Sequence, residues 1–209
     1  GQELLDAAPR AGIVHATTFN YRGNPLVQEA RLRIGRGDIG TPQFVHGCYL
    51  QDWLLEPSDY SWRLDPNQGG ASSAMADIGS HWCDLAEHLT GLRITEVLAT
   101  LRTVVAQRQK PAGTREAFET ATASSPMTTV TIAAEDLGSV LLHFDNGATG
   151  SASVGQVCAG HKNDLSIEVC GASASIGWRQ ELQNELWIGH RHRANERLQK
   201  DPALVDASV

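Results

Sequence analysis

The sequence has no apolar run long enough to cross a bilayer, and it is poor in basic residues. A membrane-spanning helix needs about 20 consecutive apolar residues, and polar residues interrupt every apolar run of this chain well before that length. Lys and Arg number 17 against 24 Asp and Glu, which gives a formal net charge of -7. No basic stripe of the kind that binds nucleic acid is present. The sequence therefore argues against a membrane partner and against a nucleic-acid partner.

Cysteine is also scarce, and its four copies lie far apart. Cys48, Cys83, Cys158 and Cys170 never form a C-x-x-C pair, the spacing typical of zinc sites and redox motifs. No charged segment followed by an apolar one opens the sequence, so no signal peptide is indicated. We expect reduced, buried cysteines in a cytoplasmic protein, without disulfides and without a zinc site of their own.

The sequence does contain enough hydrophobic residues for a sizeable core, 41% of 209, which suits one large domain or one domain and part of another. At the start, residues 2–8 predict a helix that Pro9 stops, and residues 13–19 alternate as a strand. Asn24 and Pro25 are typical of a helix start, as N-cap and first helical residue. Helix, strand and helix make half of an α/β layer without its sheet.

Short strands separated by turn signals dominate the rest of the chain. The triplet Asp145-Asn146-Gly147 predicts a hairpin, residues 107–126 a polar, mobile excursion, and residues 191–209 no regular element. Short connections favour antiparallel pairing, and a helix must cover one face. We therefore expect an α+β fold with an open, mainly antiparallel sheet, helices on one face, and a partner subunit on the other. The expected strands are 44–51, 94–105, 130–133, 138–144, 148–157, 165–170, 174–178 and 185–188.

The most informative stretch places acids and imidazoles at helical spacing before the apolar residues that end near Gly91. If this stretch is a helix, Asp77, His81, Asp84 and His88 share one face. Such a face forms either a functional site or a hydrogen-bonded layer of the core. The spacing alone leaves both interpretations open.

A metal is a further interpretation of this face, because two His and a carboxylate suit zinc. Four ligands from one helix cannot converge on one point, however, and nothing in the context of His46, His143 or His161 requires these residues to complete the set. We therefore expect no metal. Nucleophilic catalysis is also disfavoured, because no G-x-S-x-G occurs and Cys83 precedes an acid that discourages a thiolate.

Several motifs occur together in a familiar order. They are Phe19-Asn20-Tyr21-Arg22, Asn24-Pro25, Gly37-Asp38-Ile39-Gly40, Trp62-Arg63, and Gly69-Gly70 followed by Asp77-x-Gly79-x-His81-x-x-Asp84. Over about residues 1–190 the chain resembles the glucose–fructose oxidoreductase / inositol dehydrogenase (Gfo/Idh/MocA) family. The resemblance implies an N-terminal Rossmann domain that binds NAD or NADP and a C-terminal α+β domain that binds substrate and mediates oligomerisation. It also implies a sugar, cyclitol or related polyol as substrate.

The sequence departs from this family in its first part. No G-x-G-x-x-G follows a strand at the start, and no Glu-Lys-Pro segment supplies the family's active-site lysine. We interpret residues 1–36 as a remnant of the Rossmann domain, its last strand and helix. Residues 37–209 are then the C-terminal substrate-binding and oligomerisation domain, which assembles a dimer or tetramer through its sheet face. The chain alone is expected to be inactive.

Oxidation of a secondary alcohol needs a base for the hydroxyl proton and an acceptor for the hydride. An imidazole titrates near neutral pH and suits the first role. The resemblance implies that His81 is this acid/base and that Asp77 orients it or binds a substrate hydroxyl. The alternative is that His81 only satisfies a contact of its helix.

The remaining candidates follow from the same resemblance. Trp62 and Arg63 are expected to line the substrate cleft, or else to anchor a loop. Asp84 either binds substrate or accepts a hydrogen bond from the backbone or an arginine. Tyr21 and Arg22 follow the expected Rossmann strand, where open α/β sheets place ligands, and are expected to contact the nicotinamide end of the cofactor. A non-catalytic binding or scaffolding module that assembles through the sheet face is the alternative function.

Overall fold

An eight-stranded sheet forms the body of the protein. The computed structural model describes residues 1–111 and 126–209. The strand order is β10-β9-β8-β7-β1-β6-β5-β2, and every neighbouring pair is antiparallel except β1 and β6. The expected open, mainly antiparallel sheet is thus confirmed. The strands are β1 (Pro42–Leu50), β2 (Ile94–Arg102), β5 (Leu137–Phe144), β6 (Thr149–Gly155), β7 (Asp164–Gly171), β8 (Ala174–Arg179), β9 (Glu185–His190) and β10 (Glu196–Gln199).

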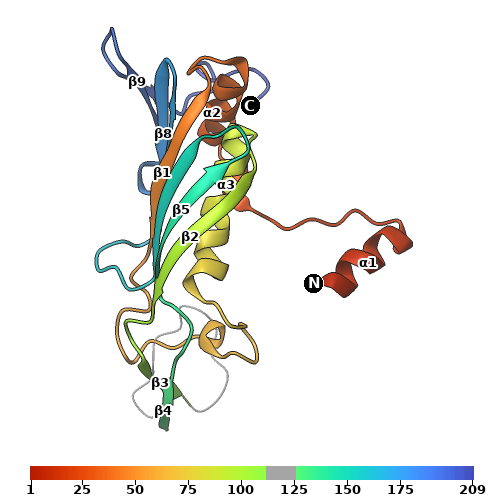
Figure 1. Cartoon of the computed structure of the whole chain (residues 1–209), viewed down its shortest axis with the longest axis vertical. Coiled ribbons are helices and arrows are strands. Elements are labelled where there is room, and N and C mark those ends of the chain that lie inside the picture. The colour runs from red at the N-terminus through yellow and green to blue at the C-terminus, as the bar shows by residue number, and fades with distance from the viewer. Residues whose placement is uncertain (112–125) are drawn as a thin grey trace.

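Two helices, α2 (Pro25–Arg36) and α3 (Ser80–Thr90), cover one face of this sheet (Figure 1). The Asn24 side chain accepts a hydrogen bond from Leu26 N, so the expected N-cap of α2 is confirmed. Apolar residues at helical spacing turn toward the sheet because burial removes them from water. They form one core with the alternate residues of the strands: Leu26, Val27, Ala30 and Ile34 from α2, and Trp82, Leu85, Ala86 and Leu89 from α3.

The hairpin between β5 and β6 confirms the turn expected at residues 145–147. Asn146 Oδ1 accepts a hydrogen bond from Ala148 N at 2.9 Å, and Gly147 has a φ of 85°. That backbone conformation favours glycine because a Cβ would approach the following carbonyl. The turn fixes the register in which Val140 pairs with Ala152.

The first 19 residues differ from the sequence-based expectation. Helix α1 (Gln2–Ala11) includes Pro9 and ends at Gly12, whose φ is 65°; it does not stop at residue 8. Residues 13–19 form no strand, because no neighbouring strand offers its backbone groups to them. They run as an exposed connection that carries α1 away from the body (Figure 1), and Val14 is fully exposed.

Two further segments correct the expectations. Strand β3 (Gln107–Pro111) pairs with β4 (Met127–Thr131) as a separate two-stranded sheet, so the first part of the expected excursion is regular. The remainder of that excursion, residues 112–125, lies outside the described residues. Strand β10, in the tail that showed no periodicity, pairs with β9; its four residues are too short to give a pattern.

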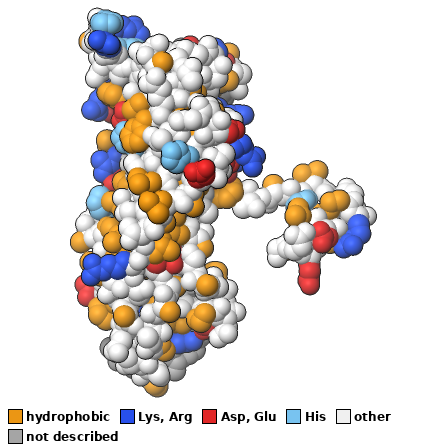
Figure 2. Space-filling model, viewed as in Figure 1, with side chains coloured by type: hydrophobic (Ala, Val, Ile, Leu, Met, Phe, Trp, Pro, Cys, Tyr) orange, Lys and Arg blue, Asp and Glu red, His pale blue; other side chains and the backbone are white. Residues whose placement is uncertain are grey.

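The other face of the sheet carries exposed apolar side chains. Leu98 on β2 lies opposite Leu141 on β5, and their exposed fractions are 69% and 56%. Figure 2 shows hydrophobic side chains gathered along the elongated body. Among the described residues, no helix is both long and apolar enough to cross a bilayer.

Candidate functional site

The Asp77–His81 motif begins on a short π-helical turn, Met75–Gly79, that leads directly into α3. π-Helical turns are often found at functional sites. One carboxylate oxygen of the buried Glu135 accepts hydrogen bonds from Ser73 N at 3.0 Å, Met75 N at 2.9 Å and the Ser72 hydroxyl at 2.7 Å. A carboxylate at this position satisfies free backbone N–H groups and complements the helix dipole. Glu135 therefore fixes the turn that carries Asp77.

The carboxylate of Asp77 is held by one group on each oxygen. Gln156 Nε2 donates to Oδ2 at 2.9 Å, and Arg63 Nε lies 3.3 Å from Oδ1. The side chain of Asp77 remains 29% exposed, so it is also accessible from a neighbouring pocket. Gln156 was not foreseen, because a glutamine after a strand carries no sequence signal for this role.

His81 lies among three aromatic rings. Its ring meets those of Phe19, Tyr21 and Tyr49 edge-on, with centroids 5.3, 5.5 and 6.5 Å away. Its Nδ1 is buried and has no hydrogen-bond partner among the described residues. A buried polar atom without a partner is rare, and it points to a group that acts on something other than its own fold.

Tyr21 and Tyr49 belong to a hydrogen-bonded cluster behind His81. Their hydroxyls are 2.5 Å apart, Tyr49 donates to Asn163 Oδ1 at 2.7 Å, and Asn163 Nδ2 donates to the Tyr21 hydroxyl at 3.1 Å. Burial and the Tyr21 contact raise the pKa of Tyr49, so this phenol stays protonated. Tyr49 and Asn163 were not predicted, because they reach the site from β1 and from the loop before β7, both distant along the chain.

Trp62 and Arg63, which the resemblance implied would line the substrate cleft, lie beside Asp77. Both line a pocket of 190 Å³ with Asp77, Ser72 and Ser73. The Arg63 guanidinium carbon lies 4.8 Å from the centre of the Trp62 ring, an arrangement that attracts a cation to an aromatic face.

Gly69, the first glycine before the motif, lets the Arg63 backbone approach closely. A Cβ on Gly69 would lie 2.1 Å from the Arg63 carbonyl oxygen, which excludes any other residue there. The pocket therefore depends on the glycine as well as on its polar side chains.

Arg22, expected to contact the cofactor, binds Asp84, for which the sequence left both substrate binding and a hydrogen bond from an arginine open. Arg22 Nε donates to Asp84 Oδ2 at 2.8 Å, and Arg22 Nη2 donates to Oδ1. His88, one turn further along α3, faces Gln28 on α2. His81, Asp84 and His88 thus share a face toward residues 19–28, whereas Asp77 contacts Arg63 and Gln156.

The helix face that carries His81 provides no cluster of metal ligands in the described part of the chain. Elsewhere in the described residues, two groups of side chains could hold a metal ion: His46 with Glu168 and Cys170, and His161 with Asp164 and Glu181. Neither includes Asp77, His81 or Asp84. Burial raises the pKa of Cys83, which keeps this thiol protonated and makes it a poor nucleophile.

Residues 35–40 spell G-x-G-x-x-G but do not form a dinucleotide-binding loop. They end α2, where Gly37 is the C-cap with a φ of 85°, and they lead into β1. A phosphate-binding loop has the opposite order, from a strand into the start of a helix. Residues 35–40 therefore lack the geometry of a phosphate-binding loop.

Comparisons with known proteins identify the family of the chain. The family model for the GFO/IDH/MocA C-terminal domain matches residues 27–177. Levoglucosan dehydrogenase of Pseudarthrobacter phenanthrenivorans is 34% identical over 187 residues, which cover 88% of this chain and 47% of that protein. An uncharacterized oxidoreductase of Bacillus subtilis is 28% identical and covered to 43% of its length. The chain thus spans about half the length of the curated relatives it matches.

Solved structures show the same fold. A levoglucosan dehydrogenase in complex with NADH and L-sorbose is 30% identical with a TM-score of 0.83, over 97% of this chain and 51% of that one. An oxidoreductase domain protein from Kribbella flavida is 31% identical with a TM-score of 0.84, over 99% and 55% of the two chains. The resemblance inferred from the motifs is confirmed, and the chain belongs to the GFO/IDH/MocA oxidoreductase family, whose C-terminal domain it matches.

Proposed function

We propose that the chain is the substrate domain of an NAD(P)-dependent dehydrogenase that oxidises or reduces a sugar, cyclitol or related polyol. The observation that carries this proposal is the buried, unpartnered Nδ1 of His81, one turn after an Asp77 that borders a polar pocket. Family relatives that bind NADH with a sugar support it. In this proposal His81 exchanges the proton of the reacting hydroxyl, and Asp77 positions that hydroxyl.

The pocket beside Asp77 suits a polyhydroxylated molecule. Its lining combines the carboxylate of Asp77, the guanidinium of Arg63 and the hydroxyls of Ser72 and Ser73, which donate and accept hydrogen bonds in close array. Trp62 is 44% exposed and supplies an apolar wall. We propose that Trp62, Arg63 and Asp84 contact substrate, Asp84 after its bond to Arg22 rearranges.

The cofactor is proposed to bind mainly outside these 209 residues. A nicotinamide would supply the hydride acceptor or donor when bound, with Tyr21 and Arg22 at its edge. Residues 13–19 support this proposal, because an exposed apolar segment with Val14 fully in solvent suits a strand that joins a further sheet. We accordingly assign residues 1–36 to the cofactor domain and residues 37–209 to the substrate domain. NAD and NADP are both compatible with the described residues.

We further propose a homodimer or homotetramer that buries the open face of the sheet. Leu98 and Leu141 form an exposed apolar pair on that face, and a second copy of the same face would cover them by twofold symmetry. The alternative function, a non-catalytic scaffold, uses the same face but needs no cofactor.

Cofactor titration of the intact natural gene product tests the proposal, followed by a screen of polyols and sugars. We expect saturable NAD or NADP binding and turnover that His81→Gln reduces by about 100-fold or more, the usual contribution of a general acid/base. His88→Gln on the same helix is the matched control and should leave turnover intact. The 209 residues alone should show no turnover. Absence of cofactor binding by the intact product would favour the scaffold.

A further inference from the structure

Gln156 joins Asp77 to the interior of the protein. It follows β6 directly, and its side chain has no exposed surface. Its Nε2 donates to Asp77 Oδ2 at 2.9 Å, opposite the Oδ1 that Arg63 approaches. The buried amide therefore holds one oxygen of the carboxylate while the other remains beside the pocket.

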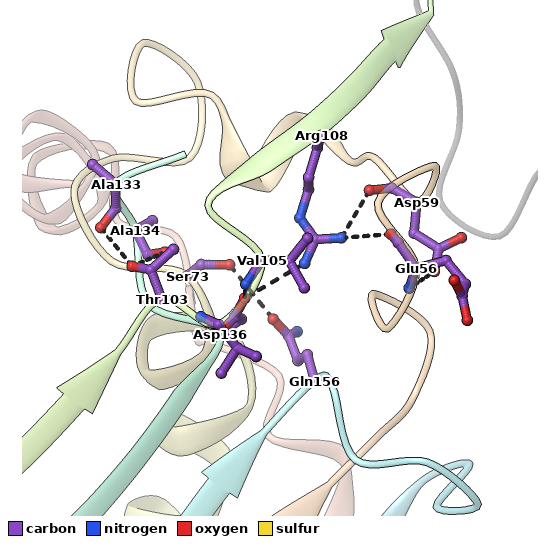
Figure 3. A network of polar contacts seen from close by, with 11 residues as sticks. Glu56, Asp59, Ser73, Thr103, Val105, Arg108, Ala133, Ala134, Asp136 and Gln156 are labelled. Atoms are coloured by element: carbon purple, nitrogen blue, oxygen red, sulfur yellow. Dashed lines mark hydrogen bonds and ion pairs between the residues drawn. The ribbon is translucent and has the colours of Figure 1, made fainter. Parts of the chain in front are cut away.

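The backbone of Gln156 is itself fixed from two sides. Its N–H donates to the Asp136 carbonyl at 2.9 Å, and its carbonyl accepts from Leu54 N at 3.1 Å. Its side-chain Oε1 faces the Ser73 hydroxyl at 3.5 Å. Figure 3 shows the side chains of Gln156 and Ser73 pointing toward each other. A glutamine held at both its backbone and its amide has little rotamer freedom left.

A buried ion pair anchors this region to the loop that carries Trp62 and Arg63. Arg108 is fully buried, lies 3.5 Å from Asp136, and donates to the carbonyls of Glu56 and Asp59 at 3.0 Å each (Figure 3). Asp136 in turn accepts from Val104 N and Val105 N. Buried ion pairs contribute little net stability, but this one fixes the loop relative to the end of β6.

We propose that Gln156 is a positioning residue that sets the orientation of the Asp77 carboxylate toward substrate. This inference rests on the function proposed above. The second partner of Asp77 is Arg63, which lies 3.3 Å from Oδ1 and is 29% exposed, whereas Gln156 is fully buried. Without the Gln156 amide, the carboxylate is free to turn fully toward Arg63 and away from the reacting hydroxyl. A neutral donor suits this role because it orients the carboxylate without cancelling its charge.

Two variants of similar shape test the role in the intact gene product. Gln156→Met removes the donor, and we expect kcat to fall by about 10- to 100-fold, the cost of a misplaced reacting group, with little change in KM. Gln156→Glu places a carboxyl against Asp77. At lower pH the introduced carboxyl is protonated and again donates, so its activity relative to wild type should recover as pH falls. A purely structural glutamine gives no such pH-dependent recovery.

Leu186→Ala is the control for loss of stability, because Leu186 is equally buried but lies on β9 away from Asp77. Below its unfolding transition this variant should keep the wild-type kcat. Wild-type kcat in Gln156→Met, or a constant ratio of Gln156→Glu to wild type across pH, would overturn the inference. If Gln156→Met does not fold, the pH dependence of Gln156→Glu decides alone.

Crystal structures of the wild type and of Gln156→Met separate this inference from the proposed function. We expect the Asp77 carboxylate to turn toward Arg63 in the variant. An unchanged Asp77 would overturn the positioning role even where the wild type shows full dehydrogenase activity. A wild type without turnover would instead refute the proposed function, and the rotation of Asp77 would still decide whether Gln156 orients it.

Discussion

Arg22 and Asp84 form a two-point ion pair that ties the segment before α2 to the helix carrying His81. Arg22 Nε and Asp84 Oδ2 are 2.8 Å apart, and the bond to Asp84 raises the pKa of Arg22. The Asp84 side chain is 9% exposed, whereas that of Arg22 is 48% exposed. The pair therefore orders the junction between the two proposed domains, and it competes with the ligand contacts predicted for both residues.

Arg22→Gln and Asp84→Asn should each lower the free energy of unfolding by about 1 kcal/mol, since one partner is half exposed and solvent weakens the pair. Because the partners interact directly, the double variant should lose less than the sum of the two single losses. Urea unfolding of all four proteins measures this coupling, and additive losses would mean that the pair does not form in solution. Cofactor titration of the same proteins tests the ligand role: Arg22→Gln should weaken cofactor binding even in the Asp84→Asn background.

The ion pairs of Asp164 should make the folded protein less stable in acid. Burial opposes its charge, but hydrogen bonds from Arg179 and His161 hold its pKa below the ordinary value. A carboxyl with a lowered folded-state pKa stabilises the protein above its unfolded-state pKa of about 3.9, and this contribution disappears as pH falls through the folded-state pKa. Urea unfolding of wild type and Asp164→Asn should therefore differ more at about pH 7 than at about pH 3.

Asp145→Asn is the control for this pH experiment, because its side chain is exposed in the β5–β6 turn. Its stability difference from wild type should stay nearly constant over the same range. A difference for Asp164→Asn that grows toward low pH would contradict the assignment.

Gly147 and Gly35 should respond in opposite directions to alanine. Neither would place a Cβ within 4 Å of another group, so backbone conformation alone decides. Gly147 has a φ of 85° in the hairpin, and Gly147→Ala should cost about 1 kcal/mol. Gly35 lies within α2, and Gly35→Ala should stabilise by roughly 0.5–1 kcal/mol. Thermal unfolding of both variants measures the contrast, and equal effects would exclude the turn assigned to residues 145–147.

The proposed assembly predicts that charge on the open face separates the subunits. Leu98→Glu, and more strongly Leu98→Glu with Leu141→Glu, should shift the protein toward monomer, because an interface cannot bury unpaired carboxylates without a large penalty. Val97→Glu is the matched control. Val97 is as exposed, at 67%, but it pairs with the buried Leu142 and so faces the other side of the strand. Light scattering distinguishes these outcomes, and a monomeric wild type would reject the assembly.

Local sequence patterns predicted most of the elements and failed where a partner was required. Asn24 capped its helix and residues 145–147 turned the chain because both effects act within a few residues. Residues 13–19 alternate like a strand yet lack one to pair with. Strand β10 forms, although it shows no pattern, because β9 offers it an edge.

In the candidate site, too, some residues could be predicted from local motifs and others could not. Asp77, His81, Trp62 and Arg63 were identified from motifs of adjacent residues, and the structure brings Trp62 and Arg63 to Asp77. The sequence analysis did not identify Gln156, Glu135, Tyr49 and Asn163, because their hydrogen-bond partners lie 28 to 114 positions away along the chain.

The N-cap at Asn24, the hairpin at residues 145–147 and the acid–imidazole spacing of the Asp77–His81 motif could be predicted from the sequence, because each depends on the chemistry of neighbouring residues. The strand order, the ion pair of Arg22 with Asp84 and the hydrogen bond of Gln156 to Asp77 became visible only in the folded chain. These depend on which distant segments the collapse of one core brings within the roughly 3 Å reach of a hydrogen bond, and that distance is not encoded in any local pattern.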